Sequence, residues 1–473
     1  MKILSNLEKI VEIKGNETLI EYDNKKLTFK IFWEKVLKLA NYFHSKKLNK
    51  ISVIETEKED FFFYIVIFAS LISGKTYIPI GANVPIKRIK KILDISKADI
   101  VITSKNLNKF STNIFHPKYI DKLKIKNKFK IKKSNNDAYI IFTSGSTGEP
   151  KGVRISRKAL DKYILWILET FFNDKIIRCS QHPSIGFDLS IADIFGTICS
   201  GGKLFPIKKK IDKIFLKKFV IKNKLTHWIS VPSLTDIIFN SRKNKNEFKN
   251  IKKIFFCGEV LRKNHLKKIF ECNKNIQVMN AYGPTEATVS CTIKKFNFKN
   301  YNIFCKPTAS FGKPIKGIEL SFTSNNKKEG ELVISGDQVS NGYLNNSKLN
   351  NLKFIEKRNK RSFITGDLCK KINGEFYFLN RKDRQIKLYG HRIELDEIDN
   401  LISDKTGNTS LSLKKGEKIE TFINGKLNKS RLIKYLKTKL PSYMIPSNIN
   451  LIKEWPKNKN YKIDEKKLLS IKV

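Results

Sequence analysis

Hydrophobic residues recur along the chain in two alternating patterns, helical spacing and short continuous runs. Helical spacing predicts helices over 27–47, 61–73, 86–95, 157–172 and 190–200. Short apolar runs between turn residues predict strands over 51–55, 77–80, 99–104, 139–142, 176–180, 226–230 and 251–256. Because strands that alternate with helices pack as parallel layers, the predicted fold class is α/β, with parallel βαβ sheets in a large N-terminal domain.

The pattern changes after about residue 300. Short strands with turns, GIELSF at 317–322, GELVISG at 330–336 and GEFYFLN at 374–380, predict a small β-rich subdomain. After NRKDRQ at 380–385 the chain reads as a small α+β domain. We therefore predict a large domain over 1–382 and a small C-terminal domain over 383–473.

The charge is strongly basic: 93 Lys and Arg against 44 Asp and Glu give +49. Such a field attracts nucleic acid, nucleotides and acidic proteins. The lysines are scattered through every segment, and no basic block is interleaved with stacking aromatics, so we predict no specific nucleic-acid partner. Abundant Lys, Asn and Ile are also what an AT-rich genome encourages.

Cysteine usage and hydropathy predict a cytoplasmic protein. The seven cysteines lie far apart, with no C-x-x-C pair and no zinc spacing, which favours a reducing compartment. Glu and Lys interrupt the apolar residues of the N-terminus too often for a secretory signal. The most apolar run, 61–74, is too short to span a bilayer, so we predict a buried helix and no transmembrane segment.

The segment YIIFTSGSTGEPKGV, residues 139–153, has the composition of an anion-binding loop. A short apolar strand leads into glycines that let backbone N–H groups approach phosphate oxygens, while hydroxyls add donors. Lys151 can neutralise charge. The loop is not a Walker A motif, because its lysine follows Gly148 by three residues and is trailed by glycine.

Five segments together resemble the adenylate-forming superfamily of acyl-CoA synthetases, luciferases and nonribosomal peptide adenylation domains. In chain order they are TSGSTGEPKG at 143–152, FDLS at 187–190, NAYGPTEAT at 280–288, TGD at 365–367 and RKDRQIKLYGHRIE at 381–394. The resemblance covers nearly the whole chain. It implies a mobile C-terminal domain and ATP-dependent activation of a carboxylate as acyl-AMP, followed by transfer to a thiol.

The resemblance implies a nucleotide site for ATP. Tyr282 would offer an aromatic face to adenine, Asn280 an amide edge, and Asp367 a carboxylate to the ribose hydroxyls. The full implied set is Thr143, Ser144, Gly145, Ser146, Thr147, Gly148, Lys151, Gly258, Asn280, Ala281, Tyr282, Asp367 and Arg381. A core tyrosine and a simple turn are the alternative interpretations of Tyr282 and of TGD.

Carboxylate attack on phosphorus needs charge neutralisation by Mg²⁺ and lysines rather than a base. By resemblance, Lys462 bridges acid and phosphate, Thr285 contacts the α-phosphate and Glu286 contacts the metal. The family usually has Asn-Gly-Lys where this chain has Asn460-Tyr461-Lys462, and a solvated lysine-rich face is the alternative.

Two further residues concern the transfer step. The resemblance puts Asp383 at the hinge of the small domain, and Lys387 at the active site in the thiol-transferring orientation. Such a swing explains how one site performs two chemistries.

The substrate assignment depends on FDLS. In amino-acid-activating members an aspartate there pairs with the α-ammonium, which assigns that role to Asp188; a helix cap is the alternative. FFCGEVL at 255–261 further resembles D-alanine:D-alanyl carrier protein ligases, in which the cysteine, here Cys257, favours a small D-amino acid. Ser230 and Val289 would complete the substrate wall. Ala192 is smaller than the residue that closes many such sites.

The predicted function is ATP-dependent activation of an amino acid, with D-alanine or another small amino acid favoured. Transfer to the phosphopantetheine arm of an acidic carrier protein would follow. An acyl- or aryl-CoA ligase is the alternative enzyme. A noncatalytic nucleotide-binding homologue is the alternative outside enzymes, because of Tyr461 and Asn380.

Overall fold

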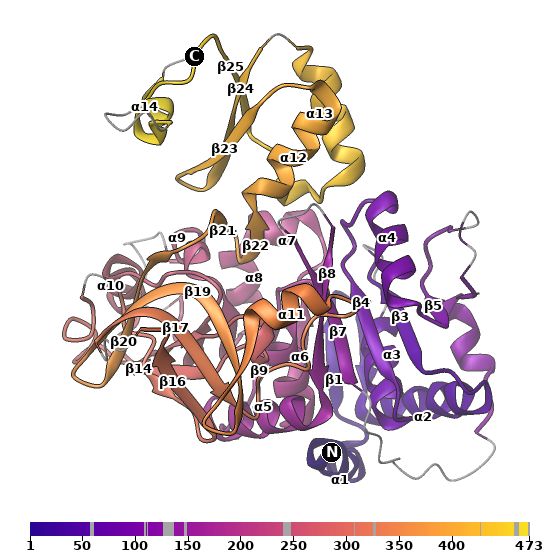
Figure 1. Ribbon diagram of the computed structural model, residues 1–473. Coiled ribbons are helices and arrows are strands. Elements are labelled where there is room, and N and C mark those ends of the chain that lie inside the picture. The colour runs from indigo at the N-terminus through magenta and orange to yellow at the C-terminus, as the bar shows by residue number, and fades with distance from the viewer. Residues whose placement is uncertain are drawn as a thin grey trace. The chain divides into compact units, whose positions relative to one another are not determined.

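The computed structural model describes residues 1–56, 61–107, 110, 112–125, 137–145, 149–239, 247–306, 308–324, 328–425, 427–457 and 463–471. The chain divides into two compact units (Figure 1). The larger contains residues 1–82, 95–141 and 152–382, and the smaller contains 83–94, 142–151 and 383–473. The smaller unit thus includes two short earlier segments as well as the C-terminal region. That its C-terminal part is mobile stays a prediction.

A nine-stranded sheet forms the core of the larger unit, in the order β15-β14-β13-β12-β11-β9-β10-β1-β2. Strands β1, β10, β9, β11, β12 and β13 run parallel, as predicted. The strands are β1 (Thr18–Tyr22), β2 (Lys25–Thr28), β9 (Arg178–Gln181), β10 (Lys203–Pro206), β11 (His227–Ser230), β12 (Lys253–Phe256), β13 (Gln277–Tyr282), β14 (Thr292–Phe296) and β15 (Lys313–Pro314).

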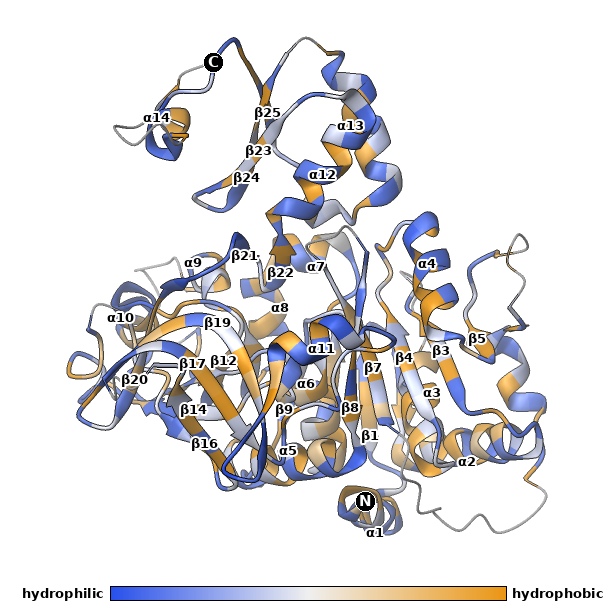
Figure 2. Cartoon of the chain, viewed as in Figure 1, coloured by the Kyte–Doolittle hydropathy of each residue, from blue (hydrophilic) through white to orange (hydrophobic). Residues whose placement is uncertain are grey.

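A six-stranded sheet has the order β6-β5-β3-β4-β7-β8. Its strands are β3 (Lys50–Ile54), β4 (Thr76–Ile80), β5 (Ile100–Ile102), β6 (Ile114–Phe115), β7 (Asp137–Thr143) and β8 (Lys151–Ser156). Helix α3 (Phe62–Ile72) is buried at every position, and Figure 2 shows it and β7 as mainly hydrophobic. The apolar run that starts at residue 61 is therefore a core helix, as predicted. Across the described residues, we find no helix with the length and apolar character needed to cross a membrane.

The other predicted helices are also confirmed. They are α2 (Phe29–Ser45), α4 (Ile86–Ser96), α5 (Arg157–Thr170) and α6 (Leu189–Cys199). Shorter helices are α7 (Lys210–Ile214), α8 (Leu216–Lys222), α9 (Thr235–Ile238), α10 (Lys263–Cys272) and α11 (Ser347–Lys353). Helix α1 (Lys2–Lys14) was not predicted from the sequence. Its first N–H groups donate to the carboxylate of Asp161 on α5 at 3.1 Å, which satisfies helix donors that have no partner within α1.

The predicted β-rich subdomain is present as a five-stranded sheet. It contains β16 (Ile318–Phe322), β17 (Glu329–Gly336), β18 (Phe354–Lys357), β19 (Lys360–Ile372) and β20 (Glu375–Arg381). Strands β19 and β20 pair antiparallel, with Asp367 directly opposite Arg381. This register brings two predicted nucleotide-binding residues together across the sheet.

The C-terminal part of the smaller unit is α+β, as predicted. It contains β21 (Gln385–Leu388), β22 (His391–Glu394), α12 (Leu395–Thr406), β23 (Ser410–Lys415), β24 (Lys418–Asn424), α13 (Lys429–Lys439), β25 (Asn448–Ile452) and α14 (Glu465–Ser470). Helices α12 and α13 lie on one side of the three-stranded sheet and α14 on the other (Figure 1). Strand β24 is therefore buried on both faces: Ile419 and Ile423 pack with α12 and α13, and Phe422 packs with Leu468 of α14.

A neutral histidine is buried at the start of β11. His227 is 0% exposed, its Nε2 lies 3.0 Å from Asp174 Oδ2, and its ring stacks on Phe172. Burial lowers the pKa of His227 to about 4, although the charge of Asp174 opposes this shift. Between pH 6.5 and about 4, His227 is therefore neutral in the folded chain and protonated in the unfolded chain.

We predict that acidification removes stability through His227. As the pH falls from 7 to about 4, protonation of His227 in the unfolded chain should lower the free energy of unfolding by about 3 kcal/mol. Denaturant titrations across this range should show a steeper pH dependence for the wild type than for His227→Gln. The exposed histidine variant His44→Gln should keep the wild-type slope. Equal slopes in all three proteins would contradict the assignment.

Candidate functional site

The predicted site residues of the larger unit gather at the carboxyl ends of adjacent parallel strands. Ser230 ends β11, and its carbonyl accepts a hydrogen bond from the N–H of Cys257, just after β12, at 3.2 Å. Asn280 and Tyr282 lie at the end of β13, and Asn280 pairs in register with Phe256. In parallel α/β sheets ligands bind at this edge, so the topology itself assembles the candidate site.

A hydrogen-bonded triad joins this edge to the β-rich subdomain. The hydroxyl of Tyr282 donates to Asp367 Oδ2 at 2.5 Å, and Arg381 Nη1 donates to Asp367 Oδ1 at 2.5 Å. Asp367 is 2% exposed, so both carboxylate oxygens have partners in a water-poor environment. Three residues that sequence analysis assigned to adenine and ribose therefore form one contiguous group.

The aromatic ring of Tyr282 is held by packing and by its hydroxyl. Phe311 stacks on one ring face, with centroids 4.5 Å apart. Burial, then the charge of Asp367, raises the pKa of Tyr282 well above its ordinary value, so the hydroxyl stays protonated and acts as a donor. Asn280 donates from Nδ2 to the carbonyl of Ser310 at 2.8 Å and anchors the neighbouring loop. Adenine stacking on Tyr282 would have to use the ring face opposite Phe311.

The segment from Thr285 to Val289 has a constrained backbone. The short 3₁₀ helix Thr285–Ala287 buries Glu286, whose Oε1 accepts a hydrogen bond from the Tyr343 hydroxyl at 2.6 Å. Thr288 and Val289 follow with φ values of 57° and 68°. A β-branched residue in this left-handed region is strained, and strain of this kind clusters at functional sites.

The donor set fits a Mg²⁺ ion that arrives with nucleotide phosphates. Among the residues that the structure describes, no three His, Cys, Asp or Glu side chains gather to hold a metal alone. Mg²⁺ is commonly bound by one or two carboxylates together with substrate phosphates. The buried carboxylate of Glu286 supplies one hard oxygen ligand of the required kind.

Asp188 stands at the start of α6 but does not cap it. Its backbone angles are already helical, its side chain makes no capping hydrogen bond, and it is 6% exposed. Cys257 is also buried, and its thiol donates to the carbonyl of Val289 at 3.7 Å. The structure thus brings Cys257, Val289 and Ser230 together, as a common substrate wall requires.

The described part of the glycine-rich loop belongs to the smaller unit. Ser144 Oγ donates to the carbonyl of Arg392 at 2.8 Å, and Lys151 Nζ pairs with Glu394 Oε1 at 3.1 Å. A Cβ on Gly145 would lie 2.1 Å from the carbonyl oxygen of Glu149, so this turn requires glycine. Lys151 is therefore held by a carboxylate of the motif that begins at Arg381. Phosphate binding by Lys151 would exchange one anionic partner for another.

The remaining predicted residues lie in or next to strands, or outside the described residues. Thr143 ends β7, Ala281 lies in β13, and Gly258 adopts a φ of 102° after β12. Lys387 lies in β21, where its carbonyl accepts a hydrogen bond from Lys414 Nζ at 2.8 Å. Ser146, Thr147, Gly148 and Lys462 lie outside the described residues.

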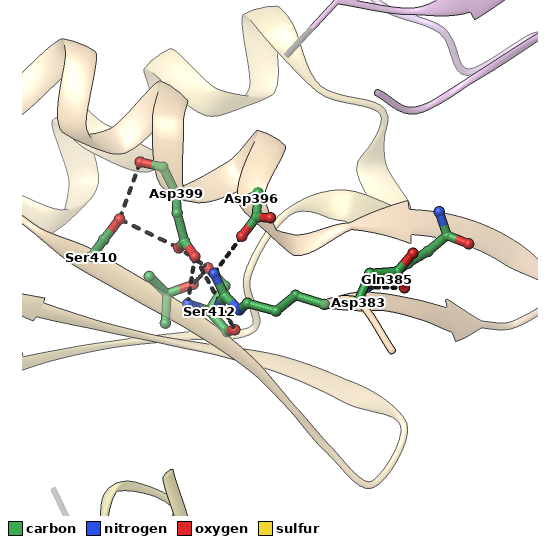
Figure 3. A network of polar contacts seen from close by, with 8 residues as sticks. Asp383, Gln385, Asp396, Asp399, Ser410 and Ser412 are labelled. Carbon is green, nitrogen blue, oxygen red and sulfur yellow. Dashed lines mark hydrogen bonds and ion pairs between the residues drawn. The ribbon is translucent and has the colours of Figure 1, made fainter. Parts of the chain in front are cut away.

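The predicted hinge, Asp383, is followed by a polar network around Arg384 (Figure 3). The guanidinium of Arg384 reaches Asp396 at 2.5 Å, Asp399 at 2.9 Å and the Ser412 carbonyl at 2.7 Å. Asp399 also accepts hydrogen bonds from the hydroxyls of Ser410 and Ser412. The segment just after the hinge position is thereby fixed to α12 and β23.

Several residues that contact the candidate site could not be predicted from the sequence. Phe311 contacts Tyr282, Tyr343 contacts Glu286, and Arg384 directly follows Asp383. Of these three residues, only Arg384 lies within one of the five motifs. A lone aromatic residue carries no chemical signal in a sequence without its spatial neighbours. Their roles follow only from the contacts.

Comparison with known proteins gives a family match over residues 7–344, to the model described as AMP-binding enzyme. One relative, the D-alanine–D-alanyl carrier protein ligase of Bacillus cytotoxicus, is 30% identical and covers 99% of both chains. The protein of the same name from Staphylococcus epidermidis is 28% identical with the same coverage.

Solved structures show the same fold. The Vibrio cholerae adenylation domain AlmE, in complex with glycyl-adenosine-5'-phosphate, has a TM-score of 0.84 and 22% identity, and the match covers 99% of this chain and 97% of AlmE. The fused adenylation-PCP protein NpsA-ThdA from Klebsiella oxytoca has a TM-score of 0.82 and 17% identity, with 95% and 93% covered. These similarities confirm the predicted adenylate-forming fold.

We predict that Arg384→Ala destabilises the C-terminal region. The substitution leaves the buried carboxylate of Asp399 without its cationic partner, so the free energy of unfolding should fall by about 2 kcal/mol. Denaturant unfolding, together with limited proteolysis of the region after 383, measures this loss. Arg431→Ala, an exposed arginine on α13, is the matched control and should change stability little. An equal loss in the free energy of unfolding for Arg384→Ala and Arg431→Ala would show that the network does not stabilise the fold.

Proposed function

The chain belongs to the AMP-binding enzyme family, and on this premise we propose that it activates an amino acid with ATP and transfers it to a carrier protein. The relatives named D-alanine–D-alanyl carrier protein ligase match over nearly the full chain, which favours D-alanine or another small amino acid. The observation that carries the proposal is Asp188, a buried carboxylate that does not cap its helix.

The first chemical step joins the two substrates. The substrate carboxylate attacks the α-phosphorus of ATP, a P–O bond forms, and pyrophosphate leaves with the electron pair of the broken bond. The β-rich subdomain and β13 would bind the nucleoside: Tyr282 against adenine, Asp367 and Arg381 at the ribose. Asp188 would pair with the α-ammonium and so fix the carboxylate relative to the phosphate, which supplies much of the rate enhancement.

Magnesium would neutralise phosphate charge when it is bound with ATP. Glu286 would hold it, and the Tyr343 hydroxyl at 2.6 Å fixes the orientation of that carboxylate. Thr285, one residue earlier, is proposed to contact the α-phosphate. Lys462 is proposed to bridge the acyl carboxylate and the phosphate.

The glycine-rich loop would bind the β and γ phosphates. In the present conformation Lys151 is paired with Glu394. Because a triphosphate is a stronger anion than one carboxylate, nucleotide binding would draw Lys151 away from Glu394. The proposed loop set is Thr143 to Gly148 with Lys151.

The second step is thiol transfer. The phosphopantetheine thiol attacks the acyl carbonyl, a thioester forms, and AMP leaves. We assign Asp383 as the hinge and Lys387 as a residue of the transfer orientation. The chain's charge of +49 would attract an acidic carrier and speed its association. A cytoplasmic location stays a prediction.

We predict amino-acid-dependent ATP–pyrophosphate exchange that requires Asp188. A panel of L- and D-amino acids, with fatty and aryl acids as controls, should give exchange with small amino acids. Asp188→Asn should lower kcat/KM for them about 100-fold or more, because the substrate ammonium then lacks a buried counter-charge. The exposed variant Asp121→Asn should keep wild-type exchange.

Two results would redirect the proposal. Exchange with only fatty or aryl acids, unaffected by Asp188→Asn, would make the chain an acyl- or aryl-CoA ligase. No exchange with any acid, from protein that binds ATP, would favour a noncatalytic nucleotide-binding role.

A separate prediction concerns Lys462. Lys462→Ala should reduce adenylation about 100-fold or more, since a single preorganised charge at a transition state contributes on this scale. Lys457→Ala, an exposed lysine in the same segment, is the control for a general loss of positive charge. Equal activity in both variants would assign Lys462 to a solvated surface instead.

A further inference from the structure

A buried ion pair is bonded to the loop that packs against Tyr282, and neither of its residues takes part in the proposed chemistry. Nζ of Lys294, on β14, lies 2.8 Å from Oε1 of Glu375, at the start of β20, and the two side chains are 14% and 10% exposed. The Lys294 ammonium also lies over the ring of Phe304, 3.1 Å from its centroid. A buried ion pair carries a desolvation cost that a surface pair does not, so its position calls for a physical reason.

The second carboxylate oxygen of Glu375 holds Ser310, in the loop between β14 and β15. The Ser310 hydroxyl donates to Glu375 Oε2 at 2.7 Å and accepts a hydrogen bond from the Gly312 N–H at 2.9 Å. Ser310 is 0% exposed. Because a hydrogen bond to a carboxylate is stronger than one between neutral groups, the ion pair anchors this serine firmly.

Backbone hydrogen bonds fix the rest of the same loop. The Phe311 N–H donates to the Phe376 carbonyl at 3.0 Å, and the Phe376 N–H donates to the Gly312 carbonyl at 3.2 Å. The Ser310 N–H donates to the Phe304 carbonyl at 2.8 Å. Residues 310–312 are therefore tied both to β20 and to the preceding part of the loop.

Two consecutive residues of this loop contact the residues proposed to bind adenine. The Ser310 carbonyl accepts a hydrogen bond from Asn280 Nδ2 at 2.8 Å. The Phe311 ring stacks on the Tyr282 ring, with centroids 4.5 Å apart and planes 29° apart, and Phe376 stacks on Phe311 in turn, with centroids 6.1 Å apart. The loop thus sets both the amide of Asn280 and the tilt of the Tyr282 ring.

We propose that Ser310 and Glu375 are positioning residues for the adenine base, with Glu375 acting through Ser310. This inference rests on the proposed function, in which Tyr282 and Asn280 contact adenine. A ring that is held from one face presents its other face at a fixed angle. That angle matters most for a base with a large aromatic surface, so the pair should strengthen the binding of ATP more than that of a pyrimidine nucleotide.

The test measures the dissociation constants of ATP and UTP with the full-length protein and Mg²⁺ by isothermal titration calorimetry, without an amino acid. The wild type should bind ATP about 10-fold or more tightly than UTP, because a purine stacks over a larger area. Ser310→Ala should weaken ATP binding about 10-fold and UTP binding by about 3-fold or less, since mainly the stacking geometry is lost.

A second variant tests whether Glu375 acts through Ser310. Glu375→Gln keeps the shape of the side chain but removes its charge, and it should also weaken ATP binding more than UTP binding. In the double variant, the loss of ATP affinity should be smaller than the product of the two single losses, because residues that act through one contact are not additive. If Ser310→Ala fails to fold, Glu375→Gln still gives the comparison of ATP with UTP.

The matched control is Ser362→Ala, which removes a fully buried hydroxyl on β19 that lies 2.7 Å from the Ser335 hydroxyl. It should leave the ratio of the ATP and UTP dissociation constants unchanged. Equal losses for ATP and UTP in Ser310→Ala, or independent losses in the double variant, would overturn the inference. Either result leaves the proposed function standing, because amino-acid-dependent exchange tests that function separately. A wild type that does not bind ATP would overturn both.

Discussion

The parallel alignment of β9, β11, β12 and β13 is the constraint on which the site depends. Parallel strands place all their carboxyl ends on one edge of a sheet, so residues far apart in sequence meet without any long-range motif. Ser230, Cys257 and Tyr282 each lie at or just after the end of such a strand. The sheet therefore fixes the distance between the proposed substrate wall and the proposed nucleoside site before any side chain makes a contact.

Several proposed ligand-binding groups are already paired with one another. Asp367 bonds both Tyr282 and Arg381, and Lys151 bonds Glu394. Buried charges need partners, and in the absence of a ligand the protein supplies them. Ligand binding would then replace protein partners with ligand groups. Its free energy is the difference between the ligand-free and ligand-bound states, in both of which these groups are paired.

Much of this architecture could be predicted from the sequence, because hydrophobic spacing determines helices and strands locally. The apolar run that forms α3 and the strands β11 and β12 are examples. Contacts made across the fold could not be predicted. The stacking of Phe311 on Tyr282 and the position of Tyr163 beside Ser290 depend on packing between elements far apart in the chain. A motif indicates which residue binds, but only packing shows which residues contact it.

One turn couples the two halves of the proposed chemistry. A Cβ on Gly283 would lie 2.5 Å from the Cα of Ser290, so the chain folds back tightly on itself between these residues. Within that fold, Glu286 accepts a hydrogen bond from the Tyr343 hydroxyl, while Val289, of the proposed substrate wall, has a left-handed backbone. Because the left-handed backbone of Val289 is costly, surrounding contacts such as the Thr288 bond to the Gln338 carbonyl must hold it. A change at the proposed substrate wall would therefore act on the position of Glu286, the proposed metal ligand, through a single short segment.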